Sequence, residues 1–406
     1  MMRSLFAGVT GLRNHQTRMD VIGNNIANVN TIGFKAGRVT FRELFYQTTR
    51  GASAPMADRG GTNPQQIGLG MAISGIDVIH GQGNLQNTGK MTDLSIQGNG
   101  FFTMADGQRI VYSRSGAFEV DSAGFLSDTS NGLRVQGWVA ESGVLPIRDQ
   151  ENLADIRVRL GESINASPTD RIAFANNLNP GAATGETYVA VVDVFDSLGA
   201  TSTLTLTFEK AAAPNTWNWS ASGPAGLAGN SGTLTFNSLG QYQASTGGPL
   251  TFTPSGANPV TITPDFSTVT QLGGQSTVTV SERNGFPMGT LETFTIDDTG
   301  VITGVFSNGL TNVLGQVAIT GFTNPGGLLK RGENLYVASN NSGLPQVGEA
   351  GKASRGTIAP GTLEMSNVDI SKEFIEMIIT QRGFQANSRI ITTSDEMLQE
   401  LVNIKR

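Results

Sequence analysis

The chain has 406 residues, of which 38% are hydrophobic and 15% are charged, and its formal net charge is −6. This length allows roughly two to four domains, and the negative net charge argues against a general nucleic-acid binder. Because the chain has no cysteine, disulfides, thiolate catalysis and cysteine-ligated zinc are excluded.

The first predicted element is a helix over residues 2–28, with apolar side chains at helical spacing. Gly8, Gly11 and Gly23 lie inside it, and each costs about 1 kcal/mol relative to alanine. We therefore expect packing, not intrinsic propensity, to order this helix. An ordinary helical hairpin within one chain is the alternative to packing in an assembly. The predicted seam consists of Leu5, Val9, Leu12, Met19 and Ile26, with Ile22 beside them.

Two histidines are the only candidates for acid–base chemistry or metal binding near neutral pH. His15 lies in the first helix between Asn14 and Gln16, and we interpret it as a solvent-facing residue. His80 follows an apolar run and is interpreted as the end of a strand. Neither is flanked by carboxylates or hydroxyls, so no catalytic, metal or cofactor site is expected.

An asparagine-rich segment is predicted to end the first helix. Asn24, Asn25 and Asn28 compete for backbone hydrogen bonds, and Gly33 permits a positive φ before Phe34 and Lys35. Residues 31–70 contain many glycine, proline and polar residues. They predict an extended connector with no core of its own.

From residue 71 onward, short runs of β-branched and aromatic residues predict strands. A motif of Asp or Asn, two residues and Gly recurs between them and predicts tight hairpin turns. None of its copies continues with the carboxylates of a calcium loop, so we interpret the motif as structural. The copies begin at Asp121, Asp196, Asn237 and Asp297 and end at Gly124, Gly199, Gly240 and Gly300.

Composition divides the β-rich region. Residues 211–264 contain no charged residue or histidine, and their threonine-rich alternation predicts a compact β structure with a neutral surface. We expect a middle β domain from residues 71–145 and 285–364, and an outer inserted β domain from residues 146–284. One interpretation is that the neutral surface slides against neighbouring copies, because no ion pairs lock one register. The alternative is a surface that simply tolerates sequence change.

A second helix is predicted over residues 371–402. An apolar stripe must be buried, and its nearest complementary partner is the helix at the other terminus. Residues 1–30 and 365–406 should therefore form a coiled-coil-like inner domain, with the two β domains stacked outward. The predicted fold class is mainly β with paired terminal α-helices, in a subunit that polymerises through its ends. The stripe consists of Phe374, Met377, Phe384, Ile391, Leu398 and Val402, widened by Ile378 and Leu401.

Signatures of enzymes and membrane spans are absent from the sequence. It contains no GxxxxGK[ST], GxSxG or HExxH motif, so we expect no enzyme. No run approaches the roughly 18–20 apolar residues of a membrane helix, and the N-terminus lacks the apolar core of a secretory signal. A secreted β-rich adhesin is an alternative of a different class, but it gives no reason for matched terminal helices.

Several segments resemble the flagellar rod–hook axial protein family. The strongest resemblance is GNNIANVNTIGFKAGRVTF at residues 23–41, which includes the asparagine-rich segment and Lys35. Further resemblance lies at residues 88–104, 113–128, 315–336 and 363–404. It implies a structural subunit of a helical homopolymer, a hollow tube between the motor rod and the filament.

The length of the chain favours the longer members of this family, which form a short curved tube that acts as a universal joint. A distal rod or junction protein is the alternative. The resemblance implies a rod protein below, a junction protein to the filament above, and a cap and the type III export apparatus during assembly. It also implies an extracellular location, reached without a cleaved signal peptide, and neither nucleic-acid binding nor membrane insertion.

Overall fold

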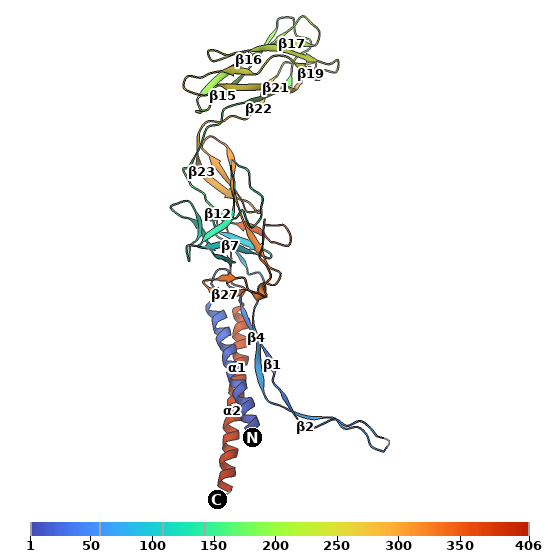
Figure 1. The fold of residues 1–406 in the computed structure, drawn as a ribbon, viewed down its shortest axis with the longest axis vertical. Coiled ribbons are helices and arrows are strands. Elements are labelled where there is room, and N and C mark those ends of the chain that lie inside the picture. Colours follow the sequence, from blue (N-terminus) through green and yellow to red (C-terminus); the bar gives the residue numbers. More distant parts are fainter. Residues whose placement is uncertain (1, 57, 108, 142, 405–406) are drawn as a thin grey trace. The chain divides into compact units, whose positions relative to one another are not determined.

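A computed structural model describes residues 2–56, 58–107, 109–141 and 143–404. The fold is mainly β with a helix at each end, which confirms the predicted fold class (Figure 1). The chain divides into two compact units. Unit 1 comprises Met1–Val158, Thr295–Thr303 and Val313–Arg406, and unit 2 comprises Arg159–Phe294 and Gly304–Asn312.

Unit 1 contains both helices and a mainly antiparallel sheet with the strand order β25-β11-β7-β8-β28-β27. Its buried core includes Phe102 and Phe118, whose ring centroids lie 5.1 Å apart, and Trp138. Its elements are α1 (Met2–Ala27), β1 (Gly37–Glu43), β2 (Tyr46–Arg50), β3 (Gln65–Gly68), β4 (Met71–Val78), β5 (Leu85–Asn87), β6 (Leu94–Gln97), β7 (Phe101–Asp106), β8 (Arg109–Ser113), β9 (Phe118–Val120), β10 (Leu126–Asp128), β11 (Arg134–Val139), β12 (Ala154–Asp155), β26 (Ile319–Gly321), the 3-10 helix η1 (Pro325–Gly327), β27 (Leu329–Gly332), β28 (Leu335–Val337), β29 (Gln346–Gly348), β30 (Thr357–Pro360), β31 (Thr362–Glu364) and α2 (Ile370–Ile404).

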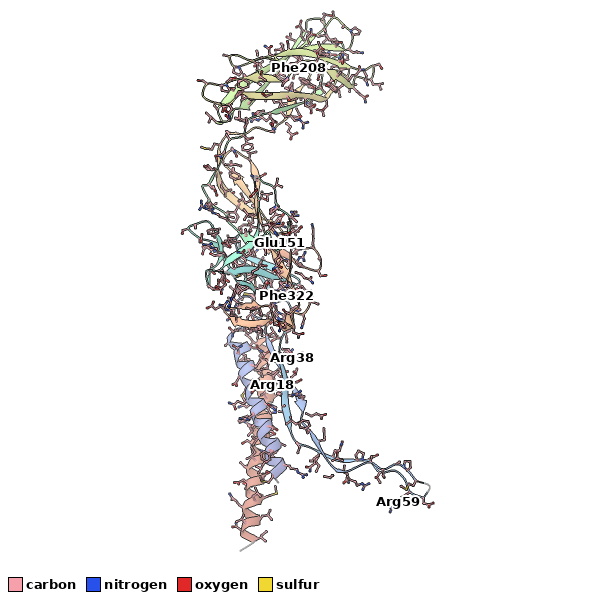
Figure 2. The ribbon with its side chains drawn as sticks, viewed as in Figure 1. Arg18, Arg38, Arg59, Glu151, Phe208 and Phe322 are labelled. Atoms are coloured by element: carbon pink, nitrogen blue, oxygen red, sulfur yellow. The ribbon has the colours of Figure 1, made fainter. Side chains whose placement is uncertain are left out.

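The two helices pack antiparallel, and small and polar residues lie at several of their contacts. Ser4 meets Ser394 near one end of the pair, with 3.4 Å between their hydroxyl oxygens. Arg18, labelled in Figure 2, pairs with Glu376 toward the other end. Between these contacts Gly11 is buried, and a Cβ added there would lie 2.5 Å from Asn387 Oδ1. A side chain at this position would therefore displace the Asn387 side chain from the helix contact.

The prediction that His15 faces solvent is wrong. Its Nδ1 atom is buried, and its ring meets Phe41 edge-on with 5.9 Å between centroids. A Cβ added at Gly383 of α2 would lie 2.8 Å from the His15 ring. The absence of a side chain at Gly383 therefore makes room for the imidazole in the helix contact.

The predicted connector contains β1, β2 and β3, which take part in two consecutive strand pairs. β1 pairs with β4, and the side chain of Asn14 in α1 donates to the Met71 carbonyl at 2.7 Å. β2 pairs with β3, and every residue of both strands is exposed. This second hairpin, residues 44–69, is called the arm below.

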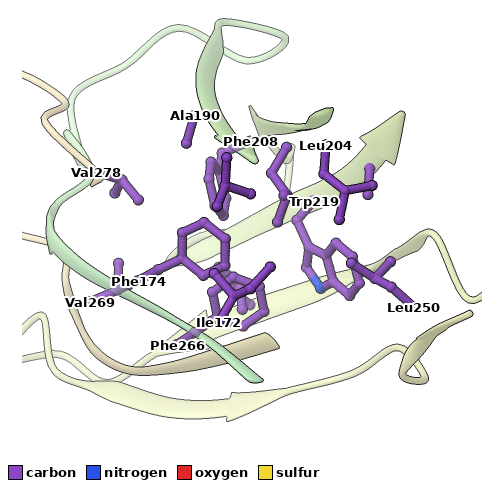
Figure 3. Close-up of a cluster of buried hydrophobic side chains, with 14 of the residues drawn as sticks. Ile172, Phe174, Ala190, Leu204, Phe208, Trp219, Leu250, Phe266, Val269 and Val278 are labelled. Atoms are coloured by element: carbon purple, nitrogen blue, oxygen red, sulfur yellow. The ribbon is translucent and has the colours of Figure 1, made fainter. Parts of the chain in front are cut away.

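Unit 2 consists of two sheets around one aromatic core (Figure 3). One sheet has the order β15-β16-β17-β18-β19 and the other β20-β21-β14-β22. Phe174 stacks on Phe266 with 5.2 Å between ring centroids, and Trp219 packs beside them. The strands of these sheets are β14 (Arg171–Asn177), β15 (Thr187–Phe195), β16 (Thr201–Lys210), β17 (Thr216–Ser222), β18 (Ser231–Phe236), β19 (Tyr242–Ser245), β20 (Leu250–Phe252), β21 (Val260–Thr270) and β22 (Thr279–Arg283). The chain passes between the units through β23 (Gly289–Ile296), β24 (Val301–Phe306) and β25 (Thr311–Val317), and β13 (Ser163–Ile164) pairs with β23.

The uncharged segment 211–264 does not form a core alone. Its first strand, β17, pairs with β16, which ends in Glu209 and Lys210. Its last residues, in β21, run parallel to β14. Strands from outside the segment therefore complete both sheets.

The four Asp/Asn-x-x-Gly motifs lie at turns between paired strands. In each, the Oδ1 atom of the first residue accepts hydrogen bonds from the backbone amides two and four residues later. The closing glycine donates its N–H to the carbonyl of the first residue, and a left-handed φ is easiest for glycine. The φ angles are 88° at Gly124, 83° at Gly199, 79° at Gly240 and 79° at Gly300.

Replacing Gly11 with leucine should loosen the helix pair. The added side chain would meet Asn387, and overpacking of this kind costs about 1–3 kcal/mol. Hydrogen exchange of α1 and α2 should therefore become faster. The matched control is Gly23→Ala, because no atom lies within 4 Å of its added Cβ, and this change should slow exchange. Equal exchange in the Gly11 variant and the parent would contradict the close contact.

Candidate assembly surface and the buried charged joint

Large apolar side chains stay exposed on both terminal helices. Phe6 of α1 is 64% exposed, and Ile378 and Ile379 of α2 are 56% and 55% exposed. An apolar surface of this extent is unusual for a monomeric protein and marks a binding surface. The exposed set comprises Met2, Phe6, Val9, Ile370, Phe374, Ile375, Ile378, Ile379, Ile390, Met397, Leu401, Val402 and Ile404; we call it the apolar helix surface.

The predicted seam residues fall into two groups. Leu5, Leu12, Met19, Ile22, Ile26, Met377, Phe384, Ile391 and Leu398 are buried or half-buried. Val9, Phe374, Ile378, Leu401 and Val402 are exposed. The helix pair within one chain leaves the second group exposed, whereas Ile391 of the first group lies at its contact, next to Gly8. The burial of the second group in an assembly stays a prediction.

The asparagine-rich segment connects the end of α1 to β1. The Asn25 side chain donates to the Gly37 carbonyl at 2.8 Å and accepts from the Gly37 amide at 2.9 Å. Asn28 donates to the Asn24 carbonyl at 2.9 Å. Gly33 has a φ of 69°. These contacts fix the direction in which the chain leaves the helix.

Phe34 and Lys35 are both buried. The Lys35 ammonium donates to Glu364 Oε1 at 2.6 Å and to the Gly81 carbonyl at 2.8 Å. Both charged side chains are fully buried. Arg114, 3% exposed, approaches the other carboxylate oxygen, with 3.6 Å between its Nε and Oε2. Lys35, Arg114 and Glu364 are called the charged joint below.

Hydrogen bonds to backbone groups around the charged joint connect distant parts of unit 1. The Gly33 amide donates to the Glu364 carbonyl at 2.8 Å, and the Ala36 amide donates to Asn367 Oδ1 at 2.8 Å. The Asn367 side chain donates to the Ile79 carbonyl at 2.8 Å. The segment after α1, the end of β4 and the segment before α2 therefore meet at one point.

Sequence reasoning placed Lys35 in a motif but missed Arg114, Glu364 and Asn367. The ion pair joins residues 329 positions apart, and no local pattern reports such a pairing. The only available signal was that all of these residues lie in segments that resemble the same family.

His80 lies against aromatic rings beside the joint, two residues after β4 ends. Its ring centroid is 5.7 Å from that of Phe101 and 5.6 Å from that of Tyr336. Burial, together with the positive charges of Lys35, Lys330 and Arg114, lowers the pKa of His80 to about 4. The imidazole is therefore neutral near pH 7.

Neither a metal centre nor a membrane span is found in the ranges that the structure describes. No group of three or more histidine or acidic residues there is placed to hold a metal ion. Neither terminal helix, over its described residues, combines the length and apolarity needed to cross a bilayer.

Comparison with known proteins places matches along the whole chain. Residues 5–35 match the family "Flagella basal body rod protein", and residues 95–165 match "Flagellar hook protein FlgE/F/G D1 domain". Residues 163–286 match "Flagellar basal body protein FlaE D2 domain", and residues 359–404 match "Flagellar basal body rod FlgEFG protein C-terminal". The flagellar hook protein FlgE of Borreliella burgdorferi is 43% identical, over all of both chains. The chain belongs to the flagellar hook protein family. It is a structural subunit of the flagellar hook and not an enzyme.

A solved structure agrees with the fold. The crystal structure of the flagellar hook protein FlgE2 of Helicobacter pylori matches with a TM-score of 0.55 and 16% identity, covering 69% of this chain and 100% of that one. The rod protein FlgG of Bacillus subtilis aligns over all of both chains at 32% identity.

Replacing Glu364 with glutamine should open the charged joint. The change leaves Lys35 and Arg114 buried without a carboxylate, and breaking a buried pair in this way costs about 3–5 kcal/mol. Hydrogen exchange at the Gly33 and Gly83 amides should accelerate accordingly, because both donate to Glu364.

The matched control for Glu364→Gln is Glu119→Gln. Glu119 pairs with Lys90 at 3.3 Å, with side chains 63% and 46% exposed, and such surface pairs contribute about 0–1 kcal/mol. If both variants lose the same protection against hydrogen exchange at these amides, the charged joint does not hold unit 1 together.

Acidification should destabilise unit 1 through His80. The folded pKa of about 4 lies below the ordinary value of 6.5, so the unfolded chain binds the proton first. The contribution of His80 to stability is complete above about pH 6.5 and is lost as pH falls toward about 4. Denaturant unfolding over this range should show a smaller pH dependence for His80→Gln. An unchanged slope would contradict the proposed environment of His80.

Proposed function

We propose that the chain polymerises into a curved hollow tube through the apolar helix surface, and that this tube is the universal joint of the flagellum. In this role it transmits motor torque from the rod to the filament. The observation that carries the proposal is the distribution of side chains on α1 and α2. Their mutual contact includes glycine, polar residues and half-buried apolar residues such as Ile391, while many large apolar side chains remain exposed.

The energy available from this surface is sufficient to drive assembly. A fully buried large apolar side chain contributes about 1.5–3 kcal/mol, and Phe374, Ile375, Ile378 and Ile379 alone are each 49% or more exposed. α2 has 35 residues, so at about 1.5 Å per residue it spans roughly 50 Å. Helices of neighbouring copies can therefore share a long contact.

The arm supports a second contact between copies. A two-stranded hairpin is marginally stable alone in water, yet Phe45 and Met56 in the arm are 81% and 79% exposed. Docking on another copy would bury these side chains and order the strands. The arm therefore extends the assembly surface beyond the helices.

The four-part domain division is part of this proposal. Residues 1–30 and 365–406 would form the inner domain, 31–70 the connector, 71–145 with 285–364 the middle domain and 146–284 the outer domain. The uncharged strands β17–β20 would allow outer domains to slide past one another, because no ion pairs fix a single register. The alternative of a merely tolerant surface predicts no effect of surface charge on bending.

Specific neighbours follow from the family. We expect a rod protein below the tube, a junction protein to the filament above it, and a cap and the type III export apparatus during assembly. The relatives support this placement through their identity over the full chain. Export would proceed without cleavage of a signal peptide.

Replacing Ile378 with aspartate should abolish tubes while the protein stays folded. The change places a charge within the apolar helix surface, where assembly would have to desolvate it. Ile147→Asp is the matched control, because Ile147 is 78% exposed but lies outside the helices. Electron microscopy and sedimentation should show curved tubes for the control only.

Two results would count against the proposed assembly. Normal curved tubes from Ile378→Asp would show that the apolar helix surface does not drive polymerisation. Straight short rods from the parent chain would favour the rod alternative over the universal joint.

A further inference from the structure

A cavity of about 420 Å³ lies beside the charged joint, within unit 1. Its polar walls include Arg114, Arg355 and His80, and Phe101 and Phe322 supply apolar surface. Among the described residues that line it, none is acidic. This volume falls in the range of small-molecule sites, which combine apolar walls with a few placed polar groups.

The charges around this cavity do not balance. The charged joint contains two cations and one carboxylate, and all three side chains are at most 3% exposed. Arg355 adds a further cation, and over the ranges that the structure describes it forms no ion pair. The nearby carboxylate of Glu349 is already paired with Arg148 and Lys352. A buried charge without a counter-charge lowers the free energy of unfolding.

Both arginines retain hydrogen-bond donors. A guanidinium has five N–H groups, and Arg114 donates to the carbonyls of Gly98 at 2.5 Å and Ile96 at 3.4 Å. Arg355 donates through Nε to the Glu349 carbonyl at 2.9 Å. The remaining groups are suited to a carboxylate, which arginine binds in a planar, bidentate geometry.

His80 gives an independent indication of an occupant. Its Nδ1 atom is buried and has no hydrogen-bond partner, although buried polar groups are normally paired. Its lowered pKa arises from burial and from the surrounding positive charges, and those charges equally favour an anion.

We propose that this cavity binds a carboxylate, held by Arg114 and Arg355, with the carbon skeleton of the ligand beside Phe101 and Phe322. The carboxylate can come from an acidic side chain of a second copy or from a free small molecule. The site is formed within one unit of one chain, so it does not depend on the proposed polymerisation, and the two can fail separately.

The test uses soluble full-length protein titrated with citrate at constant ionic strength. Calorimetry should detect binding to the parent chain and at least a tenfold loss of affinity in Arg355→Gln, as expected for a lost charged hydrogen bond. Arg331→Gln is the matched control. Arg331 pairs with Asp106 at the surface at 2.5 Å and does not line the cavity, so its variant should bind citrate like the parent.

A second variant at the same position separates loss of the binding site from misfolding of the protein. Arg355→Lys keeps the charge but loses the planar fork, so its affinity should lie between those of the parent and Arg355→Gln. Equal citrate affinity in all variants, or no binding to the parent at millimolar citrate, would overturn the proposal.

Assembly in the presence of citrate identifies the source of the carboxylate. If a second copy supplies it, tube formation should release bound citrate, and citrate should slow assembly of the parent more than assembly of Arg355→Gln. If the natural ligand is a free small molecule, the tubes should retain citrate. Both results require the site to exist.

Discussion

The contact between Lys35 and Glu364 is the constraint on which the arrangement of unit 1 depends. Both side chains are fully buried, and they lie 329 positions apart in the chain. A buried ion pair adds little net stability over an apolar contact, but it strongly penalises arrangements that leave either charge unpaired. Since Gly33, Gly81 and Gly83 bond to the same two residues, the alternatives to this one geometry are costly. Both helices therefore leave the β strands of unit 1 from a single defined point, where load can pass between them.

The terminal helices divide their surfaces between two tasks. Glycine and small polar residues allow α1 and α2 to approach closely, but contacts of this kind bury little apolar area. Many large apolar residues are nevertheless left exposed, where they lower the solubility of a single chain and supply binding energy in an assembly. A helix pair with leucine-rich internal packing would be more stable alone and would have less to gain from neighbours. The observed distribution suits a subunit whose ends are completed by other copies.

Local features of the fold were predictable from the sequence, and distant pairings were not. The helices at residues 2–28 and 371–402 agree closely with α1 and α2 because periodicity is a local signal. His15 was misplaced because its contact with Gly383 requires knowing how two distant helices cross. The same limit hid the pairing of Glu364 with Lys35. It also hid the role of the uncharged segment, whose strand β17 belongs to a sheet with the charged strand β16. An apolar stripe shows that a partner exists, but not whether that partner lies in the same chain.

The construction of unit 2 restricts where a tube of such subunits can deform. Its core is filled by stacked and edge-on aromatic rings, and close-packed interiors transmit strain because they compress little. Its hairpins at Asp196 and Asn237 are each closed by two side-chain bonds as well as the backbone bond. A rotating curved tube must change its contacts once in every turn, so the changes fall on surfaces between copies. Contacts between surfaces without ion pairs can be broken and re-formed at the lowest free-energy cost, because no directional charged bond has to break. A chain that concentrates rigidity in its cores and leaves its β17–β20 surface uncharged fits the proposed sliding of outer domains.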